Sequence, residues 1–201
     1  MPVDVQQYLR SVDPMKKNTA AWARALARKH LETPLPRRWA HTQGVARQAR
    51  TLAPILGNKA DLLEAAAWLH DIGYAPDLVN TGFHPLDGAR YLRDTHHADV
   101  HLCRLVAHHS CAVIEARERG LADELTSQFG IDPPGLIQPL IYCDMTTTPD
   151  GDSVSVSNRI AEIRERYGPA HLVSRFIQLA EPQLRATVRN VQNEARFAGL
   201  I

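Results

Sequence analysis

The chain has 201 residues, of which 44% are hydrophobic and 22% are charged, as in an ordinary globular domain. A net charge of +1 lacks the basic excess of proteins that bind nucleic acid over an extended surface. No apolar run reaches the roughly 18 residues of a membrane helix, and residues 1–6 lack a signal peptide's basic leader and apolar core. Three isolated cysteines favour reduced thiols in a cytoplasmic protein.

The first half of the chain predicts a leader followed by helices. Residues 1–18 are polar and carry two prolines, so we expect the folded domain to span 19–201. Prolines and the Gly57-Asn58 pair divide the apolar periodic segments that follow. The predicted helices cover residues 19–31, 37–56 and 59–70, and a further helix begins at Pro85.

The second half also predicts helices and no strands. No apolar segment alternates with a period of two, which favours an all-α, single-domain helical bundle. The C-terminal helices are expected within residues 152–201. The predicted helices cover residues 99–110, 115–128 and 135–144, a segment capped by Ser157 that ends before Gly168, and a last segment from about Ala170.

Three ionisable residues lie on apolar faces of different predicted helices. His41 shares a face with Val45 and Ala49, and the same spacing puts His70 and Asp144 among buried positions. Taken singly, each has an ordinary explanation, such as a hydrogen-bonded core histidine or a capping aspartate. Together they favour one metal site, because buried imidazoles and carboxylates need a compensating partner.

The order of these residues resembles the HD superfamily of metal-dependent phosphohydrolases, over about residues 36–148. The matching motifs are Trp39 to Ala46, Leu69 to Gly73, Phe83 to Ala89, Val106 to His109 and Tyr142 to Asp144. The second of them includes Ile72-Gly73, as in the common variant of the signature.

The resemblance implies a set of metal ligands. His41, His70, Asp71 and Asp144 would hold a first metal. His84 and His108 would hold a second, with Asp71 bridging the two. His109 is interpreted as a residue behind the ligands or facing solvent.

This ligand set indicates one or two divalent ions such as Mn, Fe, Ni, Co or Zn. The expected reaction is hydrolysis of a phosphoester or phosphoanhydride by metal-activated water, with Asp71 and His70 in the catalytic role. The expected substrate is a small phosphorylated molecule, nucleotide-like in character. Two alternatives stay open: a di-iron oxygenase on the same cage, and a ligand-binding or regulatory module that keeps its metal without turnover.

Departures from the best-known subfamilies leave the substrate, and the oligomeric state, open. Tyr74 stands where many members carry a lysine directly after the signature glycine. The nearest arginine after Asp144 is Arg159, whereas the bacterial diadenosine-tetraphosphate hydrolases carry one shortly after the closing aspartate. Arg37-Arg38 and Arg164-Glu165-Arg166 are interpreted as solvated helix surface.

Overall fold

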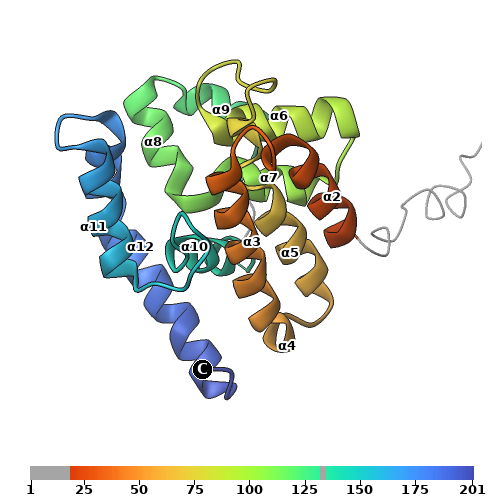
Figure 1. The fold of residues 1–201 in the computed structure, drawn as a ribbon, viewed down its shortest axis with the longest axis vertical. Helices are drawn as coiled ribbons and strands as arrows, with labels where there is room; N and C mark the ends of the chain where they lie inside the picture. The colour runs from red at the N-terminus through yellow and green to blue at the C-terminus, as the bar shows by residue number, and fades with distance from the viewer. Residues whose placement is uncertain (1–18, 132–134) are drawn as a thin grey trace, which may run out of the picture.

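The computed structural model describes residues 19–131 and 135–201, which form an all-α fold (Figure 1). The expected leader, residues 1–18, lies outside these ranges. Within them, extended pairing is limited to a single bridge between Thr147 and Ser153. No helix of the described chain is both long enough and apolar enough to cross a membrane.

The first half of the chain builds one side of the bundle. Short 3-10 turns connect or extend its helices at Gly57–Lys59 (η1), Ile72–Tyr74 (η2) and His109–Cys111 (η3). The helices are α2 (Thr19–Leu31), α3 (Pro36–Thr51), α4 (Ala53–Leu56), α5 (Ala60–Leu69), α6 (His84–His96) and α7 (Val100–His108).

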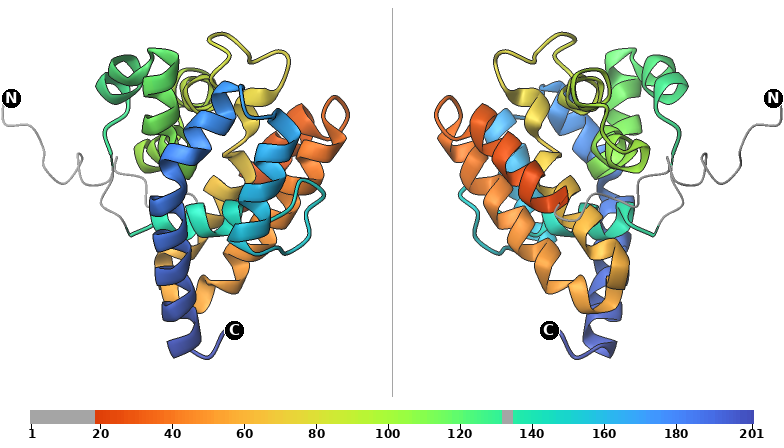
Figure 2. Two further views of the ribbon diagram at one scale, coloured as in Figure 1. Left: turned by 90° about the vertical axis from the view of Figure 1, so that its left-hand side faces the viewer. Right: turned by 90° about the vertical axis from the view of Figure 1, so that its right-hand side faces the viewer.

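The second half covers the other side. The helices are α8 (Ala112–Arg119), α9 (Ala122–Gln128), α10 (Ile137–Met145), α11 (Val156–Tyr167) and α12 (Leu172–Phe197). The long helix α12 packs against α8, α10 and α11 and runs down one side of the molecule to the C-terminus (Figure 2).

Helix α5 lies at the centre of the core. Its run from Ala65 to Leu69 is buried throughout, as expected for a segment that is apolar on all faces. It packs against α2 and α3, and also contacts α7 and α10. His70 and Asp71 follow directly after this helix, so they lie in the interior of the bundle.

Three predicted elements differ from the structure. The expected helix 37–56 divides at Leu52, because Pro54 lacks the N–H that a continuous helix needs. The expected helix 115–128 divides at Gly120, which adopts a left-handed conformation with φ of 71° and ends α8. Helix α11 is capped by Ser155 rather than by Ser157, since the Ser155 hydroxyl accepts from the Asn158 N–H at 3.2 Å.

Two glycines allow backbone segments to approach each other closely near the His and Asp positions of α3, α6 and the end of α5, because a side chain at either position would collide with the neighbouring backbone. A Cβ on Gly73 would lie 2.1 Å from the carbonyl oxygen of His84, so the glycine lets η2 touch the start of α6. A Cβ on Gly44 would lie 2.5 Å from the carbonyl oxygen of Gly151. This second contact seats the loop after α10 against α3.

Candidate metal centre

Four parts of the chain contribute ionisable side chains to one buried cluster. Their ligand atoms form two groups that share Asp71, each with all atoms within 4.8 Å of one another. The first group is His41, His70 and Asp71, and the second group is Asp71, His84 and His109. His41 comes from α3, His70 and Asp71 from the end of α5, His84 from the first turn of α6, and His109 from η3.

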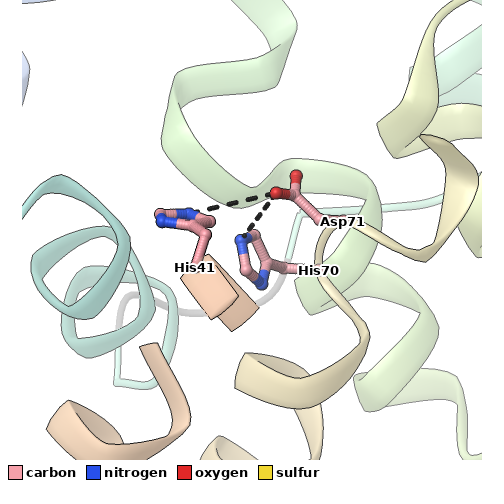
Figure 3. Close-up of side chains that lie close together, drawn as sticks. All are labelled: His41, His70 and Asp71. Atoms are coloured by element: carbon pink, nitrogen blue, oxygen red, sulfur yellow. Dashed lines mark ion pairs between the residues drawn. The ribbon is translucent and has the colours of Figure 1, made fainter. Parts of the chain in front are cut away.

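In the first group the imidazoles turn toward one carboxylate oxygen (Figure 3). Asp71 Oδ2 lies 3.3 Å from His70 Nε2 and 3.9 Å from His41 Nε2. Asp144, near the end of α10, extends this group because its Oδ1 lies 3.0 Å from His41 Nε2. The four residues expected to hold a first metal are therefore brought together.

The second group faces the other oxygen of the same carboxylate. Asp71 Oδ1 lies 3.3 Å from His84 Nε2 and 4.0 Å from His109 Nε2. The two imidazole nitrogens are themselves 3.0 Å apart. The Asp71 carboxylate thus lies between the two groups and presents one oxygen to each.

Backbone carbonyls hold three of these rings in one tautomer. The Nδ1 atoms of His41, His70 and His109 lie 2.9, 2.8 and 2.7 Å from the carbonyls of Thr148, Ala67 and Val106. A carbonyl only accepts, so each Nδ1 carries the proton and donates it. In the neutral ring, each Nε2 then presents a lone pair to the cluster. Metal-binding histidines are held by partners of this kind behind the ring.

The electrostatics of the cluster keep both of its carboxylates ionised. Burial alone would raise the pKa of Asp71, but the charges of Arg38 and His70 hold it well below its ordinary value. Burial has the same tendency at Asp144, whose pKa is lowered nevertheless by the hydrogen bond and charge of His41. Burial lowers the pKa of both His84 and His109. The second group therefore joins one ionised carboxylate, that of Asp71, to two neutral imidazoles, an arrangement of electron-pair donors.

These residues fit a divalent metal ion by the chemistry of their donors. The buried Nε2 of His70 makes no hydrogen bond among the described residues and has the Asp71 carboxylate oxygen 3.3 Å away, and such an atom is costly to bury unless something binds it. Ligands at about 2.1 Å from a common ion lie roughly 3.0–3.4 Å apart. The separations of 3.0 and 3.3 Å in the cluster match this spacing, whereas the 3.9 and 4.0 Å from Asp71 to His41 and His109 are longer.

The structure brings His109, rather than the expected His108, into the cluster. His108 Nε2 lies 2.7 Å from the carbonyl of Phe129, and His108 belongs to neither group. Ser110 and Cys111 adopt left-handed conformations with φ of 48° and 62°, so the helix ends just as His109 is reached. Helical spacing contained this signal, since His109 follows Leu102 by seven residues and Leu105 by four.

Three residues at the cluster were not singled out as site residues. Arg38, interpreted from the sequence as surface, places Nη1 2.7 Å from Asp71 Oδ2. Its guanidinium lies over the Tyr74 ring at 4.0 Å, and Tyr74 in turn stacks on His84 at 3.9 Å. The Ser110 hydroxyl donates to Asp144 Oδ2. Arg38 stands three residues before His41, which is the helical spacing that could have revealed it.

Two small cavities of about 80 and 70 Å³ adjoin the cluster. Asp71, His84, His109 and Asp144 line the larger one, together with apolar side chains of α11 and α12. His41 lines the smaller one. The cluster is therefore buried but reached by space into which a small group can enter.

Comparison with known proteins identifies the family. The model of the HD domain matches residues 38–180, a range that includes every member of both groups. Searches of curated proteins and of solved structures found no match. Because the match covers well over half of the sequence, the chain belongs to the HD domain family, a superfamily of metal-dependent phosphohydrolases.

Proposed function

We propose that the chain hydrolyses a phosphoester or phosphoanhydride bond of a small, nucleotide-like molecule with the help of divalent metal ions. One observation carries the proposal: ring nitrogens fixed by backbone carbonyls converge with the two buried carboxylates. Such a set of nitrogen and oxygen donors suits Mn, Fe, Co, Ni or Zn.

The proposed ligand assignment follows the two groups. His41, His70, Asp71 and Asp144 would hold one ion, and Asp71, His84 and His109 would hold a second. The shared role of Asp71 is supported by the distances of 3.3 Å from its two oxygens to His70 and His84. When bound, the ions would act as Lewis acids toward the phosphate and lower the pKa of a coordinated water.

The protein's own residues would prepare this chemistry. The carbonyls of Thr148, Ala67 and Val106 keep three rings in the ligating tautomer. Ser110 orients the Asp144 carboxylate by donating to its Oδ2. Arg38, bonded to Asp71, supplies a fixed positive charge where negative charge on phosphate is expected to accumulate. Burial excludes bulk water and strengthens each of these interactions.

The test combines metal analysis with a substrate screen. Protein loaded in turn with Mn²⁺, Fe²⁺, Co²⁺, Ni²⁺ and Zn²⁺ is assayed on nucleotides, dinucleoside polyphosphates and cyclic nucleotides. We expect phosphate release with at least one metal. Oxygen uptake by the iron form without phosphate release would favour the oxygenase alternative. Tight metal binding with no turnover on any substrate would favour the regulatory module.

A pair of adjacent histidines supplies a matched control for the second ion. His109→Ala should lower the metal content from close to two ions per chain toward one, because it removes a donor of the second group. His108→Ala should leave metal content unchanged, since its ring faces the Phe129 carbonyl instead. Elemental analysis that finds the opposite order would refute the assignment of His109.

A further inference from the structure

Three arginines lie beside the cluster and were not part of the expected site. Arg38 comes from α3, whereas Arg159 and Arg166 come from α11. All three line both of the cavities that adjoin the cluster. Arg159 and Arg166 are seven residues apart, so they project from the same face of α11. Helices α3 and α11, which are far apart in the sequence, therefore both place guanidinium groups at the cavities beside the cluster.

Arg159 is the most informative of the three. Its side chain is only 6% exposed, which is rare for arginine unless its donors are used. Nη1 pairs with Glu162, but the buried Nε has no hydrogen-bond partner among the described residues. A buried donor left without a partner is destabilising, whereas an anion in the adjoining cavities would satisfy it.

Once metal ions occupy Asp71 and Asp144, the carboxyl groups left near these arginines are Glu162 and Glu115, and Glu115 also pairs with Arg119. Glu162 serves both guanidiniums of α11, with contacts of 2.5 Å to Arg159 and 3.3 Å to Arg166. Arg38 is paired with Asp71, which the proposed function assigns to the metal ions. Arginine presents a planar set of donors suited to phosphate oxygens. The region therefore suits an anion that carries more than one negative charge.

We propose that Arg38, Arg159 and Arg166 form an anion seat for the terminal phosphoryl group of the substrate, so that the enzyme prefers phosphomonoesters to phosphodiesters. This inference rests on the proposed function. A terminal phosphoryl group carries a charge of about −1.5 to −2 and three free oxygens, more than the single charge of a diester. The cavity of about 80 Å³ also suits a phosphoryl group better than a whole drug-sized ligand, whose pockets measure roughly 300–1,000 Å³.

The first experiment measures binding of inorganic phosphate to the Mn²⁺-loaded protein by calorimetry. Arg159→Gln and Arg166→Gln should each weaken binding by about tenfold or more, with metal content unchanged. Arg164→Gln is the matched control, because Arg164 lies on the same helix but pairs with Glu181 outside the cavities. Phosphate affinity that is unchanged in both test variants would overturn the anion seat.

The second experiment compares hydrolysis of p-nitrophenyl phosphate and bis(p-nitrophenyl) phosphate. The wild type should have the higher kcat/KM for the monoester, and Arg159→Gln should reduce this preference. A wild type that prefers the diester overturns the inference. If Arg159→Gln fails to fold, Arg166→Gln carries the same comparison, because Arg166 is 31% exposed.

The two proposals fail in distinguishable ways. Arginine-dependent phosphate binding without hydrolysis of any substrate would refute the hydrolase and support the anion seat. Hydrolysis with phosphate binding indifferent to both arginine variants would support the hydrolase and refute the anion seat.

Discussion

Replacing Gly73 by alanine should separate the two groups of the cluster. The added Cβ would lie 2.1 Å from the His84 carbonyl oxygen and 2.6 Å from the Gly88 N–H nitrogen. Both neighbours are backbone atoms of α6, so no flexible side chain can move aside. Relief requires η2 and the start of α6 to part by about 1 Å, because contacts below roughly 3 Å are repulsive.

The expected loss of stability follows from this overlap. Overpacking in a well-packed interior costs about 1–3 kcal/mol, and the rigid neighbours place Gly73→Ala near the upper end. In a domain of this size, about 3 kcal/mol corresponds to a fall in Tm of roughly 6–12 °C. Urea unfolding and thermal melts of the metal-free protein measure both values.

The substitution should also act selectively on metal binding. His84 would move relative to Asp71 and His109, which now lie 3.3 and 3.0 Å away. The second group should therefore lose affinity for its metal ion. His41 and His70 should keep their positions on α3 and at the end of α5, so the first group should be unaffected. Elemental analysis should show metal content falling toward one ion per chain.

Gly130→Ala is the control. Its Cβ would meet Arg104 no closer than 3.8 Å, an ordinary contact, so stability should stay within about 0.5 kcal/mol of the wild type. If Gly73→Ala matches this control in stability and keeps full metal content, the close approach does not position His84 and the reasoning is wrong.

Three further substitutions test separate features. Asp71→Asn should abolish metal binding and turnover while the circular dichroism spectrum stays helical. The loss of the ion pair with Arg38 should lower the free energy of unfolding by about 3 kcal/mol. Metal retained with full activity would show that Asp71 is not a ligand. His97→Gly should raise the free energy of unfolding by about 1 kcal/mol, because exposed His97 ends α6 in a left-handed conformation; an unchanged urea midpoint would contradict this. Burial raises the pKa of Glu115 despite its contact with Arg119, so the stability linked to this group is greatest below its ordinary pKa and falls as pH rises through the folded value. Glu115→Gln should remove that part of the pH dependence in urea unfolding, and a slope equal to that of the wild type would argue against it.

The sequence by itself determined the helical class and most of the cluster. Helical spacing placed His41, His70 and Asp144 on inner faces, because side chains at steps of three and four share one side of a helix. The resemblance to the HD superfamily identified Asp71. Local rules also placed most helix boundaries, although Pro54 and Gly120 divided two predicted helices. The ligand roles themselves stay a prediction that metal analysis must test.

Tertiary structure decided the rest. Whether His108 or His109 joins the cluster depends on the left-handed residues Ser110 and Cys111, and L-residues adopt that conformation only where surrounding structure holds them in it. Arg38 and Arg159 line the same cavities although they lie more than 100 residues apart in the chain. This arrangement depends on how α11 packs near α3, and the periodicity of either helix carries no information about such non-local packing.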